Sequence, residues 1–133
     1  MATDHSQQHR RGQGVTINFA DKLNHIAGHW RPHAVADMND YQFKLVRVQG
    51  DFVWHSHADT DEAFVVIDGM LRIDLRERSL ELRAGEMAVI PKGLEHKPYA
   101  ASEVKLLLIE PAGVPNTGDA LAGDRTAEDG LWI

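Results

Sequence analysis

Three histidines and one glutamate in the middle of the chain have side chains that commonly bind metal ions: His55, His57, Glu62 and His96. The first two histidines are two residues apart in a strand-like segment, and the period of two of a strand places both imidazoles on one face. A short acidic turn then brings in Glu62, and the Pro91-Lys92-Gly93 turn directs His96 back toward the same place. We therefore predict a metal site made of three imidazoles and one carboxylate.

The donor types restrict the ion that such a site takes. The chain has no cysteine, so thiolate ligands, iron-sulfur clusters and disulfides are excluded. Imidazole suits Fe, Ni or Zn and carboxylate suits Mn, so we expect one divalent transition metal ion: Mn, Fe, Ni or Zn. A set of this kind commonly leaves a coordination position for water or substrate, which is typical of a catalytic site rather than a closed structural one.

The elements that must position these residues are short strands. Apolar and polar residues alternate from Tyr41 onward, and turn residues separate the segments. Asp68-Gly69 between two apolar runs predicts a tight hairpin. Residues 15–23 fit either an edge strand or a helical turn. The expected strands cover 41–48, 52–57, 62–67, 70–75, 79–83, 86–90 and 104–109, a pattern that favours an antiparallel sandwich or barrel.

The domain organisation follows from length and composition. A chain of 133 residues is long enough for one ordinary domain and too short for two. Residues 1–14 are polar and predict a flexible N-terminal tail, and residues 15–111 form the predicted barrel. Residues 112–133 predict a loop-rich extension, whose final Leu131-Trp132-Ile133 we expect to pack on the barrel or on a partner subunit.

Composition also excludes some partners. The net charge of -6 offers no extended positive surface for a nucleic acid backbone. The chain has no run of apolar residues long enough to span a membrane and no apolar signal segment at its start, so we expect a cytoplasmic protein without a membrane partner.

The spacing of the candidate ligands and of nearby glycines resembles the cupin family. The first motif of that family is similar to Gly50, His55-Ser56-His57, Glu62 and Gly69, and the second is similar to Gly85, Pro91-Lys92-Gly93 and His96. Two departures alter turns and leave the ligands unchanged: four residues instead of five separate Gly50 from His55, and Ala100 stands where the family has asparagine. The resemblance implies an all-β fold, the antiparallel double-stranded β-helix or jelly-roll barrel, with a metal at its centre and a homodimer as the assembly.

The parity of each strand predicts which side chains line the pocket. Phe64 and Val66 share the parity of Glu62 and are expected in the pocket wall. Phe43, Tyr41 and Tyr99 are weaker candidates for the same wall.

A narrow apolar barrel with an open metal position favours a small oxygenated substrate. The resemblance implies a metal-dependent enzyme of the dioxygenase, lyase, decarboxylase or isomerase type. The alternative is a non-catalytic cupin that binds or senses a small molecule. No DNA-binding segment is visible in the sequence, which favours the enzyme.

Overall fold

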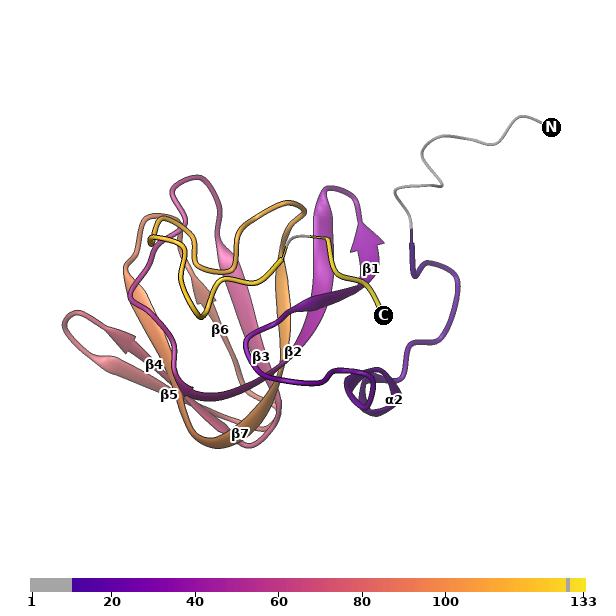
Figure 1. Cartoon of the computed structure of the whole chain (residues 1–133), viewed down its shortest axis with the longest axis horizontal. Helices are drawn as coiled ribbons and strands as arrows, with labels where there is room; N and C mark the ends of the chain where they lie inside the picture. Colours follow the sequence, from indigo (N-terminus) through magenta and orange to yellow (C-terminus); the bar gives the residue numbers. More distant parts are fainter. Residues whose placement is uncertain (1–10, 129) are drawn as a thin grey trace.

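The computed structural model describes residues 11–128 and 130–133, so residues 1–10 of the predicted N-terminal tail lie outside the described residues. The regular secondary structure of the described part is nearly all antiparallel β-sheet, which confirms the predicted fold class. Figure 1 shows the strands curving into a barrel with one short helix beside it. The elements are α2 (Phe19–Leu23), β1 (His33–Met38), β2 (Tyr41–Asp51), β3 (Glu62–Asp68), β4 (Met70–Leu75), β5 (Ser79–Arg83), β6 (Met87–Ile90) and β7 (His96–Pro111).

Strand β7 organises the barrel because three other strands pair with it. Its length lets β2 pair along most of it, while β3 pairs with its second half and β4 with its first half. Hydrogen-bonded neighbours in the sheet follow the order β1-β2-β7-β3-β6. Strand β4 also pairs with β7, and β5 pairs with β4. Alternate residues of β7 are buried, and they point into the barrel from His96 through Val104 to Glu110.

The predicted hairpin at Asp68-Gly69 is wrong. Strands β3 and β4 do not pair with each other. Both run antiparallel to β7, so the chain continues in the same direction along β7 after a bend at Gly69. Gly69 has a φ of 92°, and a Cβ there would lie 2.9 Å from the carbonyl oxygen of Glu103. The glycine is therefore required by the close approach of β7, and the apolar runs on either side of it belong to different parts of the barrel wall.

Several predicted boundaries also change. The expected strand over 52–57 is reduced to a single bridge between His55 and His96. The ambiguous stretch 15–23 contains the helix α2, which Asn18 caps by accepting a hydrogen bond from the backbone of Asp21. Strand β1 was not predicted at all, and the strand expected over 104–109 spans His96–Pro111.

The barrel has a core on each face of its main sheet. Inside it, residues such as Val46, Val48 and Leu106 pack together. Outside it, Leu45 and Leu107 pack against Leu23 of α2 and against β1. Strand β2 is thus apolar on both faces, and burial of each such side chain contributes about 1.5–3 kcal/mol to the free energy of unfolding.

The C-terminal extension returns across the barrel toward β1, as the yellow trace in Figure 1 shows. Asp119 accepts hydrogen bonds from the backbone and the hydroxyl of Ser56, and its own N–H donates to the Ser56 carbonyl oxygen. At its end, Leu131 and Ile133 hydrogen-bond Ala34 of β1. The extension is therefore fixed to the barrel at Asp119 and at its C-terminal end.

The N-terminal residues that are described also lie on β1. The backbone of Arg11 and the side chain of Gln13 hydrogen-bond Asp37. This part of the predicted tail is attached to the barrel.

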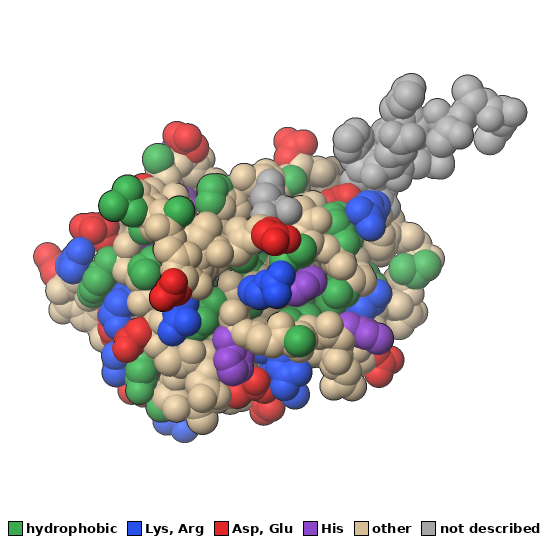
Figure 2. Space-filling model, viewed as in Figure 1, with side chains coloured by type: hydrophobic (Ala, Val, Ile, Leu, Met, Phe, Trp, Pro, Cys, Tyr) green, Lys and Arg blue, Asp and Glu red, His purple; other side chains and the backbone are tan. Residues whose placement is uncertain are grey.

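The visible face in Figure 2 carries interspersed acidic and basic side chains, with no large patch of one charge outside the grey residues. Within residues 11–128 and 130–133, no helix has the length and apolar character needed to span a bilayer.

Candidate metal centre

The four predicted ligands come together at one end of the barrel. His55 and His57 lie in the loop between β2 and β3, Glu62 is the first residue of β3, and His96 is the first residue of β7. All four are buried. One nitrogen of each histidine and one oxygen of the glutamate lie within 4.8 Å of one another.

Backbone hydrogen bonds hold the histidines in place. His55 and His96 exchange backbone hydrogen bonds of 3.1 and 2.9 Å, and the backbone N–H of Gly93 donates to the carbonyl oxygen of His57. The Pro91-Lys92-Gly93 turn thus lies against the His57 loop, and the register of β7 sets the position of His96.

The ring orientation of two ligands is fixed as well. Nδ1 of His55 lies 2.9 Å from the carbonyl oxygen of Val53, and Nδ1 of His96 lies 2.9 Å from that of Leu94. Because a carbonyl only accepts, each Nδ1 must carry the proton, and each Nε2 keeps a free lone pair. This is the tautomer in which metal-binding histidines are commonly held.

The converging atoms lack other partners among the residues that the structure describes. Nε2 of His57 and Nε2 of His96 lie 3.3 and 3.5 Å from Oε1 of Glu62. These separations suit an ion pair, but within residues 11–128 and 130–133 none of the three atoms makes an aligned hydrogen bond. Buried polar atoms without a partner are costly, so their shared direction is that expected of ligands around one cation.

The electrostatics favour the metal-binding forms of His55 and Glu62. Burial and the neighbouring His96 lower the pKa of His55 to about 4, so its imidazole is neutral at neutral pH. Burial by itself would raise the pKa of Glu62, but the imidazoles of His57 and His96 beside it lower that pKa below its usual range. Neutral imidazoles and an ionised carboxylate are the forms that bind a divalent ion.

A small apolar cavity of about 30 Å³ adjoins His55 and Glu62. It has room for about two water molecules. Its wall includes Trp30, Phe52 and Phe64, and the Trp30 and Phe52 rings stack with their centroids 4.6 Å apart. Phe64 was predicted in this wall, whereas Trp30 and Phe52 were not.

The other predicted pocket residues lie elsewhere. Val66 is in the inner core and not in the cavity wall. Phe43 packs in the outer core with Leu45, because the inner positions of β2 are the even-numbered ones. Tyr41 is exposed at the start of β2. The inward positions of β7 are the even-numbered ones, so Tyr99 faces outward, where its ring contacts the Arg72 guanidinium.

The buried pair of Lys44 and Glu110 was not predicted from the sequence. Lys44 Nζ lies 3.0 Å from Glu110 Oε1, and both residues occupy inward positions of their strands. Burial and the charge of Glu62 raise the pKa of Glu110 well above its ordinary value, so this carboxyl keeps its proton and can donate a hydrogen bond to Glu62. Lys44 and Glu110 occupy even-numbered positions, as the inner residues Val46 and Leu108 do, and this alternation could have predicted that both are buried inside the barrel.

Comparison with known proteins identifies the family. The family described as Cupin domain matches residues 43–110, which include the four candidate ligands and the barrel strands from β2 to β7. The chain belongs to the cupin family. The match ends before the C-terminal extension, so the part of this cupin that crosses the barrel lies beyond the residues matched.

Relatives of this cupin share both sequence and fold. It is 35% identical over 78 residues to the uncharacterized protein YdbB of Bacillus subtilis, covering 58% of this chain and 69% of that one. The crystal structure of a cupin-2 domain containing protein from Shewanella frigidimarina is 58% identical, covers 72% of this chain and 94% of that chain, and has a TM-score of 0.71. Protein NMB1881 from Neisseria meningitidis is 34% identical, with 74% and 100% covered and a TM-score of 0.67.

Proposed function

We propose that this cupin is a metal-dependent enzyme that acts on a small oxygenated substrate. One observation carries the proposal: three imidazole nitrogens and one carboxylate oxygen, all buried, converge within 4.8 Å, and three of these atoms have no other partner in the described part of the chain. His55, His57, Glu62 and His96 would hold one Mn, Fe, Ni or Zn ion. When bound, such an ion supplies Lewis acidity to an oxygen atom of the substrate or of water.

The residues around the ligands support a catalytic role. The rings of Trp30, Phe52 and Phe64 exclude bulk water from one side of the site, which strengthens electrostatic interactions there. Glu110 holds a proton next to Glu62 and can keep the orientation of that ligand fixed. Because the inner cavity is only about 30 Å³, the substrate end that enters it must be small.

The first experiment is elemental analysis of protein purified without chelator. We expect about one transition metal ion per chain, and the variant His57→Ala should lose most of it. The variant His33→Ala is the matched control, because His33 hydrogen-bonds the carbonyl oxygen of Arg31 and lies outside the cluster. A wild-type protein without metal after growth in supplemented medium would refute the proposal.

The second experiment tests catalysis. Protein loaded with the identified ion is assayed for oxygen uptake and for isomerisation, decarboxylation or elimination with panels of small oxygenated acids, phenols and sugars. Turnover that disappears in His57→Ala supports the enzyme. Metal and ligand binding without turnover across these panels would instead favour the non-catalytic binding cupin.

A further inference from the structure

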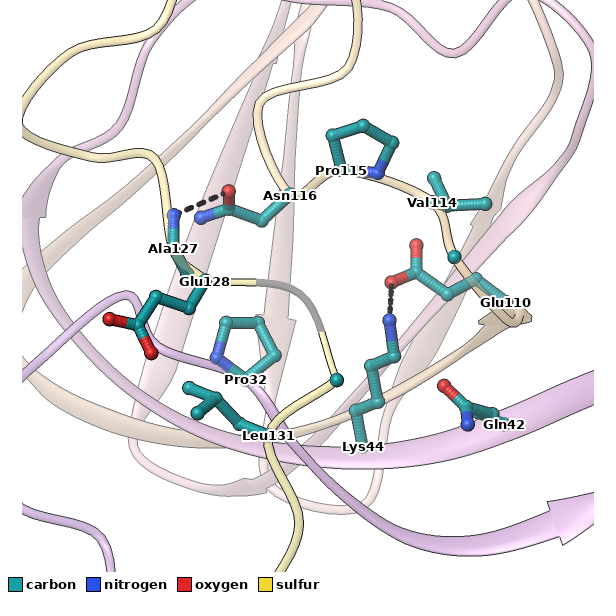
Figure 3. A pocket seen from close by; sticks show the side chains of 12 residues that line it. Pro32, Gln42, Lys44, Glu110, Val114, Pro115, Asn116, Ala127, Glu128 and Leu131 are labelled. Carbon is teal, nitrogen blue, oxygen red and sulfur yellow. Dashed lines mark hydrogen bonds and ion pairs between the residues drawn. The ribbon is translucent and has the colours of Figure 1, made fainter.

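A second cavity lies between the barrel and the C-terminal extension. It has a volume of about 110 Å³. Figure 3 shows its lining residues in a ring, with the paired ends of Lys44 and Glu110 pointing toward each other at one side. The extension contributes Pro115, Asn116 and Leu131 to the wall. None of the four candidate metal ligands lines this cavity.

Lys44 lines this cavity with an ammonium group whose hydrogen-bonding capacity is only partly satisfied by the described residues. Its side chain is 10% exposed, and within the described part of the chain its ammonium makes one hydrogen bond, to Glu110. An ammonium group has three hydrogens to donate. A buried charge is costly unless it is well paired, so the remaining donors call for an acceptor in the cavity that Lys44 lines.

The second cavity is next to the metal centre. Strands β3 and β7 pair Ala63 with Ile109, so the adjoining position of this register brings Glu62 beside Glu110 on the inner face. Pro32 and Asn116 line both cavities. A ligand at Lys44 therefore lies one side chain away from a metal ligand.

The charges of the combined site favour an anion. With a divalent ion bound, neutral imidazoles, an ionised Glu62 and a protonated Glu110, the buried set that includes Lys44 carries two net positive charges, and the exposed carboxylate of Glu128 in the cavity wall offsets one of them. Such a charge in a poorly solvated site is stabilised by a negatively charged ligand. A cavity of about 150 Å³ accommodates benzene, so one of about 110 Å³ has room for roughly four or five non-hydrogen atoms.

We propose that this cavity binds the carboxylate of a small dicarboxylic, oxo or hydroxy acid, that Lys44 recognises this carboxylate, and that a second oxygen of the same molecule reaches the metal centre. The inference rests on the proposed function and adds the substrate class to it. Lys44 is then a specificity-determining residue, and Glu110 positions its ammonium group.

The test uses malonate as the probe and malonamide as its uncharged match, titrated calorimetrically into zinc-loaded protein. The wild type is expected to bind malonate at least tenfold more tightly than malonamide. In Lys44→Met the affinity for malonate should fall at least tenfold, equivalent to about 1.4 kcal/mol. Lys105→Met is the matched control, because Lys105 lies on β7 at an outward position; it should bind malonate as the wild type does.

Zinc content, measured on every sample, separates the two proposals. If the wild type holds zinc but Lys44→Met binds malonate as well as the wild type does, the carboxylate site is refuted and the metal site stands. If the wild type holds neither zinc nor Mn, Fe or Ni after loading with each, the proposed function fails.

A second measurement does not depend on the variant folding. In wild-type protein labelled with ¹⁵N at the lysine side chains, malonate should shift the Lys44 signal and malonamide should not. Lys44→Arg, which lacks this signal, assigns it. An unmoved Lys44 signal at saturating malonate would overturn the inference.

Discussion

Gly118 holds the C-terminal extension against the loop that carries His55 and His57, and replacing it by alanine tests this contact. Its φ is 53°, in the left-handed region. A Cβ at this position would lie 2.3 Å from the carbonyl oxygen of Ser56 and 3.2 Å from Cδ2 of His55. Backbone cannot yield as a flexible side chain does, so the extension must move away from Ser56.

The expected loss of stability has two parts. The left-handed conformation costs a non-glycine residue about 1–2 kcal/mol. Moving the extension also breaks the 3.0 Å hydrogen bond from the N–H of Asp119 to the carbonyl oxygen of Ser56, worth about 1 kcal/mol. We therefore expect Gly118→Ala to lower the free energy of unfolding by about 2–3 kcal/mol.

Gly113→Ala is the matched control. Gly113 has a φ of 81°, but a Cβ there would meet no atom of the described residues within 4 Å, so only the conformational cost of about 1–2 kcal/mol applies. Urea denaturation followed by circular dichroism measures both variants. Equal losses in the two would refute the argument that the extension packs tightly on the ligand loop.

Three further predictions concern the site. His57→Ala should retain less than about one tenth of the metal bound by the wild type, because one of four ligands is lost; full occupancy by mass spectrometry would contradict the shared site. In chelator-treated protein the free energy of unfolding should fall by about 3 kcal/mol as the pH drops from 6.5 to 4, because the folded state takes up the His55 proton only near pH 4 whereas the unfolded chain does so near 6.5. Denaturation curves at several pH values check this, and the same slope in His55→Gln would count against it. Trp30→Ala should cost about 3 kcal/mol by removing the ring stacked on Phe52, and a variant as stable as the wild type in urea would show that this wall is not packed.

The ligand set and the fold class could be predicted because both follow from local spacing. The side chains of His55 and His57 point to the same cluster, as the spacing of two residues predicts, although the expected strand around them is only a single bridge. The turns before Glu62 and His96 are short, so these two side chains can take few positions relative to the strands that precede them. Alternation along β3, β4 and β5 gave those strands nearly their observed bounds.

The pocket could not be predicted because β2 is apolar on both faces. Alternation alone does not say which face of β2 is inside, and Phe43 and Leu45 face an outer core built by α2 and β1. Strand β1 itself lacks a strong alternating pattern, and its pairing with β2 depends on contacts outside its own sequence. The Asp68-Gly69 turn was misassigned because its local chemistry fits a hairpin, while β7, which begins only at His96, determines the actual pairing.

The central place of β7 has a consequence for how this protein assembles during synthesis. The residues that β2, β3 and β4 need as partners are His96 to Pro111, so these strands emerge from the ribosome long before their partner exists. Pairings between residues this distant in sequence form slowly, and unpaired strand edges are prone to aggregate while they wait. Three of the four candidate ligands are translated in that interval, so a metal ion would meet the complete set only after the last strand has been made.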